Sequence, residues 1–431
     1  MKLLVMTHSY PFGRSEAFIE SELDVLRSEW SVTVVPAFRD SSEPRNLPSD
    51  VVLDVSLATR GGRSINLPSR LWTARYAAAM KEASRHGVSL LDPRRAAYAA
   101  YYLMRGGRAA RWILRRHETD GAPILCYWSN AEAFGAAMAT SARPSIRFAC
   151  RAHRGDLYED RAVGGYLPFR ETIMEYARIV LVVSDHGRRH LARRHPRHAH
   201  KLTTSRLCLC DAAGPTGGGS TSAAPVIASC STNNPVKRVA LIAQTIAEVA
   251  SRRPDRLLRW IHAGLTTEEL IAAFSVSIPS NLQVEGTGWL AADRVREVWR
   301  AQTPRVFVNL SSSEGVPVSI MEALSMGIPV VATAAGGTAE LVDKQVGAIL
   351  PVNVSSVAAA QAVESVLGRD SSLSAAARAR YLERCAPVSV GGAFVQGLLR
   401  AFAPASPFRD SADTQQAGGS PRGSGDEIRS S

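Results

Sequence analysis

The chain opens with an alternation of apolar runs and an amphipathic stretch. Residues 3–6 form an apolar run of strand length, and a second apolar run begins at Val32. Between these runs apolar residues recur at helical spacing, at Phe18, Ile19, Leu23, Leu26 and Trp30. The pattern therefore predicts a strand, a helix and a second strand at the start of the chain, with a polar loop after the first strand.

The clearest pattern in the chain begins at Val306. There and at Ile328, apolar β-branched runs predict two buried strands. Between them Pro317 suits the first position of a helix, where a missing N–H costs nothing, and Gly327 suits the left-handed residue that ends one. The pattern thus predicts a short helix over 317–326. In such a unit the strand ends and the helix N-terminus, with its free N–H groups, form a site for an anion.

Two carboxylates flank this predicted anion site. Glu314 lies in the loop before the helix, and Glu322 lies eight residues later on the helix. Eight helical residues rise about 12 Å, so the two carboxylates cannot form a close pair on one face. Different roles are expected: Glu314 can meet the polar edge of a ligand near the anion, and Glu322 can accept two hydroxyls of a diol such as a ribose. The alternative is that both are solvated surface residues.

Length and composition predict two domains. A chain of 431 residues exceeds one ordinary core. The Gly-, Ser- and Thr-rich run 211–225 has no apolar periodicity, and we expect it to be a linker. It separates an N-terminal domain, 1–210, from a C-terminal domain, 226–389. The tail 404–431 is poor in apolar residues and is expected to be disordered.

The run from Val306 resembles the donor site of retaining glycosyltransferases with the GT-B fold, glycosyltransferase family 4. The resemblance lies in two Glu separated by seven residues within SEGVPVSIMEALSMGIPVVAT, followed by GGTAELV. It implies that Glu314 meets the donor sugar and that Glu322 holds the nucleotide ribose. It also implies that the backbone after the first Glu meets the sugar and its diphosphate, here at Gly315, Val316, Pro317 and Val318.

The N-terminal half resembles the acceptor-side domain of the same family. The string SYPFGRSEAFIESEL resembles the opening of the family, and its Gly13 suits either an approach to a phosphate or a plain turn. His153 follows a predicted strand, and the corresponding family residue reaches the transferred sugar from across the cleft; a structural His is the alternative. Residues 390–402 correspond to a helix that crosses back to the first domain. The resemblance implies an α/β protein with two Rossmann-like domains facing a cleft.

Lys237 and Arg238 are the candidate cations of the donor site. They stand at the start of a helix predicted to begin near Pro235. Cations in a first turn oppose the helix dipole unless an anion is held there, which favours a diphosphate role. Many relatives carry an Arg five residues before the Lys, where this chain has Thr232. The charge at the diphosphate must therefore come from Lys237, together with Arg238.

The formal net charge of +12 predicts an anionic partner. No aromatic-interleaved sheet, zinc finger or recognition-helix pattern supports nucleic acid. A predicted helix with Arg108, Arg111 and Arg115 on one face suits an anionic membrane surface. The basic run 186–201 does so as well. For each segment a solvated basic face is the alternative.

Neither a cofactor nor a bound metal is expected. The chain has no Asp-x-Asp pair, and the His and Cys residues between positions 195 and 210 fit no tight zinc spacing. The six Cys have no framework spacing, which favours a reducing compartment. The N-terminus lacks the features of a signal peptide, and no run of about 18 apolar residues predicts a membrane span. We expect a cytoplasmic protein, peripheral on the inner face of the membrane.

The resemblance implies a hexosyltransferase-type enzyme. It would move a sugar from a nucleotide-sugar co-substrate to a saccharide acceptor, such as one linked to polyprenyl diphosphate, with retention at the anomeric carbon. Exopolysaccharide, capsule or lipopolysaccharide synthesis is the expected setting. A glycoside hydrolase is one alternative, but it needs two carboxyls within about 5 to 10 Å. A non-catalytic basic protein that binds anionic membranes is the other.

Overall fold

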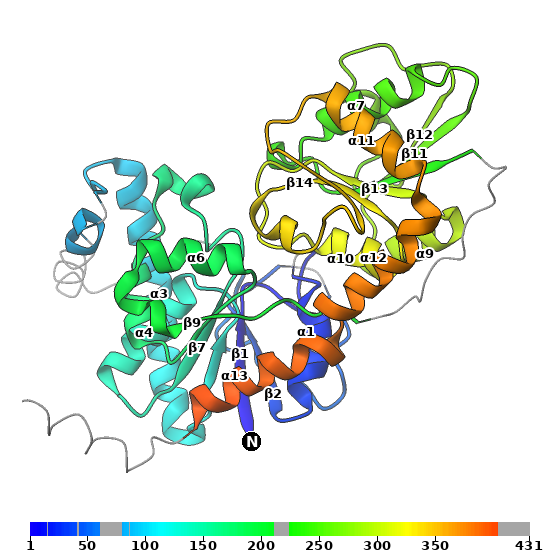
Figure 1. Ribbon diagram of the computed structural model, residues 1–431. Helices are drawn as coiled ribbons and strands as arrows, with labels where there is room; N and C mark the ends of the chain where they lie inside the picture. Colours follow the sequence, from blue (N-terminus) through cyan, green and yellow to red (C-terminus); the bar gives the residue numbers. More distant parts are fainter. Residues whose placement is uncertain (15, 41–42, 61–79, 86, 211–223, 404–431) are drawn as a thin grey trace, which may run out of the picture.

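The computed structural model describes residues 1–14, 16–40, 43–60, 80–85, 87–210 and 224–403. Within these ranges the chain forms two α/β domains, each built on a parallel sheet (Figure 1). The predicted α/β class with two sheets is thereby confirmed. The predicted linker 211–225, except for its last two residues, and the predicted tail 404–431 lie outside the described residues.

The N-terminal sheet has seven strands in the order β4-β2-β1-β6-β7-β8-β9. All of its strand pairs are parallel. The strands are β1 (Lys2–Thr7), β2 (Ser31–Pro36), β4 (Val52–Leu53), β6 (Ile124–Cys126), β7 (Phe148–Ala152), β8 (Val180–Val182) and β9 (Leu202–Thr204). A separate two-stranded sheet joins β3 (Phe38–Arg39) and β5 (Thr59–Arg60). The predicted strand, helix and strand at the start of the chain are confirmed as β1, α1 and β2.

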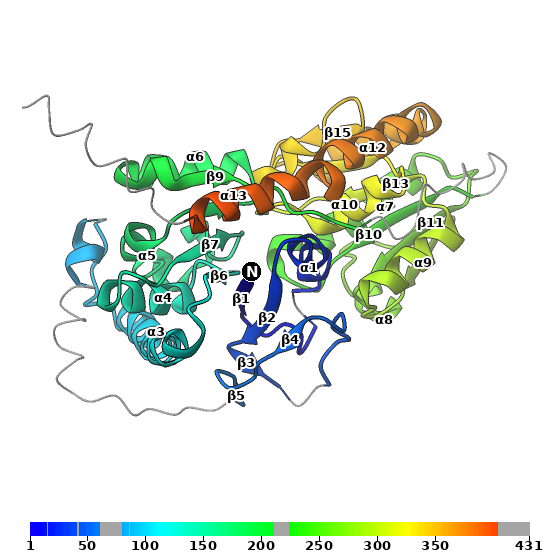
Figure 2. The same ribbon diagram turned by 90° about the horizontal axis from the view of Figure 1, so that it is seen from below.

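Helices cover both faces of this sheet (Figure 2). They are α1 (Ile19–Arg27), α3 (Pro93–Asp120), α4 (Ala131–Ala142), α5 (Arg170–Tyr176) and α6 (Asp185–Arg194). Because side chains of a strand alternate in direction, Leu3 and Val5 pack in the core that contains α1, whereas Leu4 and Met6 pack in the core that contains α3. The N-terminal domain therefore has two apolar layers, one on each face.

The C-terminal sheet has six strands, in the order β12-β11-β10-β13-β14-β15, and its pairs are likewise parallel. The strands are β10 (Val226–Cys230), β11 (Leu258–Ala263), β12 (Leu282–Gly286), β13 (Val306–Asn309), β14 (Val330–Thr333) and β15 (Gly347–Leu350). The helices in this half of the chain are α7 (Val239–Ser251), α8 (Thr267–Ile271), α9 (Ala292–Gln302), α10 (Val318–Ser325), α11 (Ser356–Leu367), α12 (Asp370–Arg384) and α13 (Gly392–Phe402). Two apolar clusters again lie on opposite faces of the sheet.

The strand, helix and strand predicted from Val306 are confirmed as β13, α10 and β14. Helix α10 begins one residue later than predicted, because Pro317 is its N-cap rather than its first residue. Gly327 has the expected positive φ, +72°. Since β13 and β14 pair in parallel, the loops that follow them lie at one edge of the sheet.

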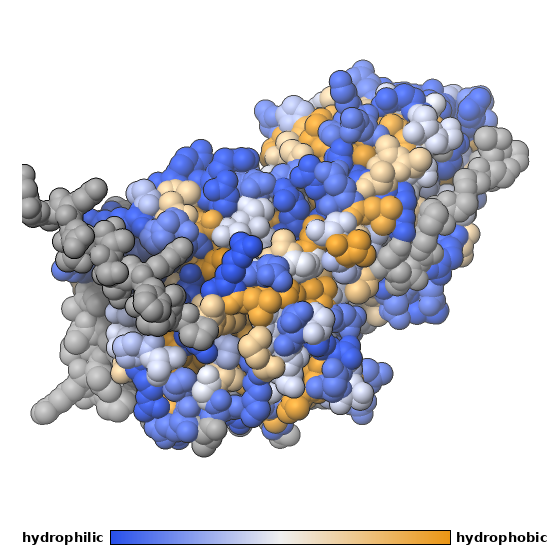
Figure 3. Space-filling model, turned by 60° about the horizontal axis from the view of Figure 1, so that its bottom comes forward, coloured by the Kyte–Doolittle hydropathy of each residue, from blue (hydrophilic) through white to orange (hydrophobic). Residues whose placement is uncertain are grey.

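A long helical stretch connects the two domains, where α12, a π-helical turn and α13 follow one another. Tyr381 of α12 is buried in a core of the C-terminal domain, whereas Phe394 and Leu398 of α13 are buried against the N-terminal sheet. Although the sequence predicted no membrane span, Ser371–Phe402 is long and apolar enough for one by length and composition. Because it packs into both domains, we interpret it as a connection between them. The face in Figure 3 mixes hydrophilic and apolar side chains.

Candidate active site

The loop after β13 is held by the two glycines that follow β14. A Cβ on Gly336 would lie 1.7 Å from the carbonyl oxygen of Glu314, and one on Gly337 would lie 2.4 Å from that of Gly315. The N–H of Gly337 donates to the Gly315 carbonyl at 2.9 Å. Only glycine permits so close an approach of two loops. The pair therefore fixes the backbone between β13 and α10, where the sequence placed the sugar and diphosphate contacts.

Glu314 forms an ion pair with Lys237. Its Oε1 lies 2.6 Å from the Lys237 Nζ, and its side chain is 6% exposed. Lys237 ends a short 3₁₀ turn after β10, so a residue from one βα loop meets a residue from another. Two residues predicted to touch the donor thus lie side by side in the structure.

Arg238 contacts the start of the same loop, directly after β13. It has a positive φ of 48° and precedes α7, so this helix begins four residues after the predicted start at Pro235. Its guanidinium donates to the carbonyls of Leu310, Ser311 and Val352. Arg238 therefore ties together the ends of β13 and β15 in this structure.

Glu322 is buried on α10 and pairs with Arg296 of α9. The Arg296 Nη1 lies 3.2 Å from the Glu322 Oε1, and the Glu322 side chain is 7% exposed. Burial raises the pKa of Glu322 to about 7, although Arg296 opposes that shift. Sequence reasoning found Glu322 but missed Arg296, which looks like any charge on an amphipathic helix. A carboxylate with this pKa changes its acceptor capacity near neutral pH.

His153 lies directly after β7, buried among aromatic rings. Its ring centroid is 4.4 Å from that of Trp128, 5.3 Å from that of Tyr127 and 5.4 Å from that of Phe18. Burial, and secondarily the charge of Arg151, hold the pKa of His153 well below its usual range. Among the described residues neither of its ring nitrogens has a hydrogen-bond partner. A neutral imidazole thus offers one donor and one acceptor to a ligand.

Two carboxylates hold the loops around His153. Asp156 accepts the backbone N–H groups of His153 and Ser129, both at 2.6 Å. Glu16 accepts the N–H groups of residues 8–10 at 2.7 to 3.1 Å, together with the indole N–H of Trp128. Gly13, the predicted phosphate contact, has a φ of +71° in the loop that Glu16 folds. Neither carboxylate stood out in the sequence.

A fully buried ion pair lies beneath this loop. The Arg151 Nη2 is 2.7 Å from the Glu22 Oε1, and both side chains are 0% exposed. The hydroxyl of Tyr127 donates to the other Glu22 oxygen, and Arg151 also donates to the carbonyls of Ser205 and Arg206 at 3.0 and 3.1 Å. The pair joins α1, β6, β7 and the segment that leaves β9. Because Arg151 is two residues before His153, the pair helps to fix the strand that leads to His153.

The two halves of the site touch across the domain boundary. Arg154, next to His153, donates from Nε to the carbonyl and the hydroxyl of Ser313, both at 3.0 Å. A Cβ on Gly315 would lie 3.0 Å from the backbone nitrogen of Arg154. In Figure 1 the loop before α10 accordingly faces the N-terminal domain. The structure therefore brings His153 of the first domain toward Glu314 and Gly315 of the second.

Glu340 adds a second contact between the domains. Its carboxylate accepts the N–H groups of Asp185 and His186, at 3.1 and 2.8 Å, in the first turn of α6. Arg206 pairs with the same carboxylate at 3.0 Å. A C-terminal-domain carboxylate thus caps a helix of the N-terminal domain.

Metal ligands do not gather in the described part of the chain. There, no three His, Cys, Asp or Glu side chains lie close enough together to hold an ion. Positive charge beside the segment between β13 and α10 comes from Lys237, Arg238 and Arg154.

Part of the chain that contains these residues matches a known protein family. Residues 224–369 match the sequence model of the family described as Glycosyl transferases group 1. This segment contains Lys237, Glu314 and Glu322. No curated protein sequence gives a significant match to the chain.

Solved structures share the fold over nearly the whole chain. The lipopolysaccharide outer core galactosyltransferase WaaB, in its apo form, has a TM-score of 0.67 at 12% identity, covering 93% of this chain and 99% of its own. Sucrose-phosphate synthase from Thermosynechococcus elongatus has a TM-score of 0.66 at 13% identity, covering 93% and 99%. HepE from Anabaena, in complex with UDP and glucose, has a TM-score of 0.64 at 16% identity, covering 92% and 99%. The match of residues 224–369 to this family model and the GT-B fold that the whole chain shares with these structures together indicate a glycosyltransferase.

Proposed function

We propose that the protein transfers a sugar from a nucleotide diphosphate donor to a saccharide acceptor with retention of anomeric configuration. The observation that carries the proposal is the Lys237–Glu314 pair, held 2.6 Å apart beside the N-terminus of α10. A half-buried cation next to a carboxylate and a helix N-terminus can hold a diphosphate and the polar edge of its sugar together. The similar HepE structure contains UDP and glucose, which supports a donor of this class.

Each residue of the site has a role in this proposal. Glu322 accepts the two ribose hydroxyls, and Lys237 with the N–H groups of α10 takes up charge on the leaving diphosphate. Glu314 leaves Lys237 to meet the sugar when the diphosphate binds. His153 offers a neutral imidazole from the other domain. The leaving phosphate would take the acceptor proton, as the resemblance to retaining enzymes implies, and no bound metal is required.

We propose cell-surface polysaccharide synthesis as the setting. The similar WaaB is a galactosyltransferase of the lipopolysaccharide outer core, and the similar TarM structure contains UDP and α-GlcNAc-glycerol. The name of WaaB specifies a lipopolysaccharide acceptor, which supports a surface saccharide as the acceptor here. An acceptor carried on polyprenyl diphosphate would place the enzyme at the inner face of the membrane.

Release of nucleotide diphosphate from a panel of UDP-, GDP-, ADP- and dTDP-sugars tests the proposal. At least one donor should be hydrolysed slowly in EDTA, with water as the acceptor. The proposal would be overturned if no nucleotide sugar in the panel is hydrolysed and no nucleotide binds. It would also be overturned if hydrolysis depends strictly on a divalent cation. Cleavage of simple glycosides instead would identify a hydrolase.

Binding of the intact donor should depend on pH through Glu322. The pKa of this buried carboxyl is about 7, and only its ionised form can accept both ribose hydroxyls. Affinity should therefore rise with pH, by about tenfold between pH 6 and pH 8. Calorimetry with a nucleotide sugar is suitable, because its diphosphate does not titrate in this range. The Glu322→Gln variant should bind weakly and without the pH dependence; a wild-type affinity independent of pH would contradict the role.

The structure narrows the basic surface proposed to bind a membrane. On α3 the guanidinium of Arg108 donates to the Ala58 carbonyl and the indole of Trp112 to Ser56, so part of that face packs within the domain. Some basic side chains of the run 186–201 also form ion pairs within the domain, such as Arg194 with Glu159. Its remaining exposed guanidinium groups belong to Arg189, Arg193 and Arg197. We propose that these three meet anionic lipid.

Vesicle sedimentation tests that surface. The protein should sediment with phosphatidylserine vesicles, and raising the salt should release it, because exposed charges are screened beyond about 8 Å at physiological ionic strength. Changing Arg189, Arg193 and Arg197 together to Glu should abolish sedimentation. The matched triple change of Arg294, Arg300 and Lys344 should leave it unchanged. Equal sedimentation with neutral vesicles would contradict the proposal. An equal loss of sedimentation in both triple variants would contradict it as well.

A further inference from the structure

A cavity of about 670 Å³ lies in the C-terminal domain, away from the proposed active site. Its lining includes residues that precede strands, such as Pro225 before β10, Leu257 before β11 and Arg305 before β13. Because these strands are parallel, their starts lie at one edge of the sheet and the active-site loops at the opposite edge. The cavity is therefore separate from the donor site.

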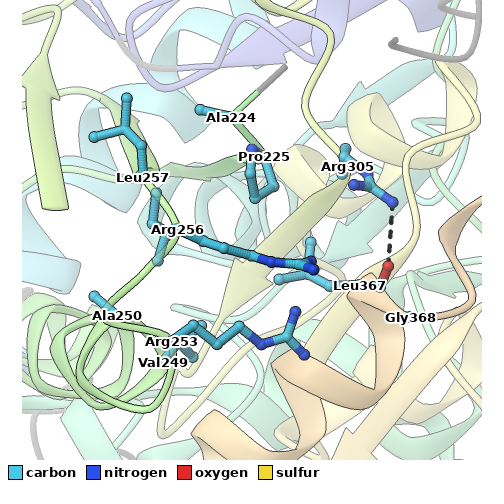
Figure 4. Close-up of a pocket in the computed structure, with 11 residues that line it drawn as sticks. Ala224, Pro225, Val249, Ala250, Arg253, Arg256, Leu257, Arg305, Leu367 and Gly368 are labelled. Atoms are coloured by element: carbon cyan, nitrogen blue, oxygen red, sulfur yellow. Dashed lines mark hydrogen bonds between the residues drawn. The ribbon is translucent and has the colours of Figure 1, made fainter. Parts of the chain in front are cut away.

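Three arginines line this cavity, namely Arg253, Arg256 and Arg305 (Figure 4). In the figure the side chain of Arg256 extends across the cavity toward Arg305, and the guanidinium of Arg253 lies nearby. Three like charges brought together repel one another unless an anion is shared among them. Arginine is also the residue best suited to hold phosphate oxygens, which it meets with two parallel N–H groups.

Two of these arginines, Arg305 and Arg253, contact groups of the protein. Arg305 donates to the Leu367 carbonyl at the end of α11, at 3.3 Å. The Arg253 Nε lies 3.5 Å from Glu364, a carboxylate that Arg252 also contacts at 3.2 Å. Cations at the C-terminal ends of helices are favourable in themselves, which explains these two positions. Arg256 lies beyond the end of α7, and no acidic side chain in the described part of the chain pairs with it.

The rest of the wall is apolar. Val249, Leu258 and Leu367 contribute buried hydrocarbon, and Leu257 is exposed over 43% of its surface at the cavity. A volume of several hundred Å³ with apolar walls and a few converging polar groups is typical of sites for small organic ligands. The cavity thus combines phosphate-binding groups with a surface for hydrocarbon.

We propose that this cavity is a second ligand site, which binds a phosphate group carried on an apolar body. Arg256 holds the phosphate together with Arg253 and Arg305, and Leu257 covers the hydrocarbon. The ligand could be a soluble phosphate ester or the headgroup end of a lipid phosphate, since both present the same chemistry here. The site does not depend on the sugar-transfer chemistry at the other edge of the sheet.

Calorimetric titration of the full chain with octyl phosphate tests the proposal. UDP is present in excess throughout, so that binding at the donor site does not contribute. The wild type should bind octyl phosphate at one site, and inorganic phosphate at least tenfold more weakly. Arg256→Glu should lower octyl phosphate affinity tenfold or more, whereas Arg294→Glu, the same charge change on α9 of the same domain, should leave it within twofold. A melting curve for each variant checks that it is folded.

A second variant tests the apolar wall without changing charge. Leu257→Ala should weaken octyl phosphate binding several-fold and leave inorganic phosphate binding unchanged. Sedimentation with vesicles containing phosphatidic acid, lost in Arg256→Glu but not in Arg294→Glu, would identify a lipid source; binding of octyl phosphate without such sedimentation would identify a soluble ester. No binding by the wild type, equal binding of inorganic phosphate, or equal effects of the two charge changes would each overturn the proposal.

Discussion

Replacing Lys237 by alanine is expected to lower turnover of the nucleotide sugar by about 10² to 10³-fold, or about 3 to 4 kcal/mol of barrier. Charge builds on the diphosphate as the glycosidic bond breaks, and Lys237 is the cation that the structure places beside Glu314 and α10. Affinity for the intact donor should fall less than turnover, because the contact strengthens as the diphosphate leaves.

Steady-state kinetics at saturating donor, with donor binding measured separately, checks this prediction. Lys344→Ala is the matched control, since Lys344 is an exposed lysine of the same domain. Lys237→Arg should retain much of the activity because it keeps the charge. Turnover of Lys237→Ala within a few-fold of the wild type would show that the helix N–H groups and Arg238 carry the charge instead.

Breaking the buried Arg151–Glu22 pair is expected to destabilise the N-terminal domain by about 3 to 5 kcal/mol. Arg151→Met leaves Glu22 with no cation in a site where both side chains are fully buried. The carboxyl then keeps only the Tyr127 hydroxyl and the weak N–H contact of Cys208 at 3.4 Å. The double variant Arg151→Met/Glu22→Gln should recover part of the loss, because no uncompensated charge remains.

Urea unfolding measures this effect. Arg27→Met is the matched control, since Arg27 forms a pair with Asp50 of similar length, 2.6 Å, on the surface. Solvent screens that pair, so the control should leave the unfolding midpoint unchanged. A midpoint for Arg151→Met equal to the wild type would contradict the view that this pair supports the loop of His153.

Local signals explain how much of the fold could be predicted. The β13–α10–β14 unit was predictable because its strands are apolar runs, Pro317 marks the helix start and Gly327 marks its end. The same signals do not show what lies next to a helix. The basic face with Arg108 suited a membrane surface by pattern, yet Ala58, fifty residues away, accepts from that arginine in the structure.

The residues of the candidate site were likewise predictable from local motifs, whereas their contacts were not. Glu314, Glu322 and His153 could be named from short motifs in the sequence. Their pairings could not be predicted: Lys237, although named as a candidate cation, meets Glu314 over 77 residues of sequence, and Arg296 belongs to a separate helix from Glu322. Such pairings depend on how the sheets bring distant loops together. The capping of α6 by Glu340 crosses a domain boundary and leaves no local signal at all.

The division of labour between the two glutamates tests the central claim most directly. If Glu322 holds the ribose, Glu322→Gln should weaken binding of the free nucleotide diphosphate and of the donor alike, because both carry the ribose. Glu314→Gln should spare the affinity for free nucleotide diphosphate and lower transfer, because its partner is the sugar. Calorimetry of nucleotide diphosphate binding to both variants decides the matter. The account predicts loss of affinity in Glu322→Gln alone, and it is contradicted if Glu314→Gln loses that affinity while Glu322→Gln keeps it.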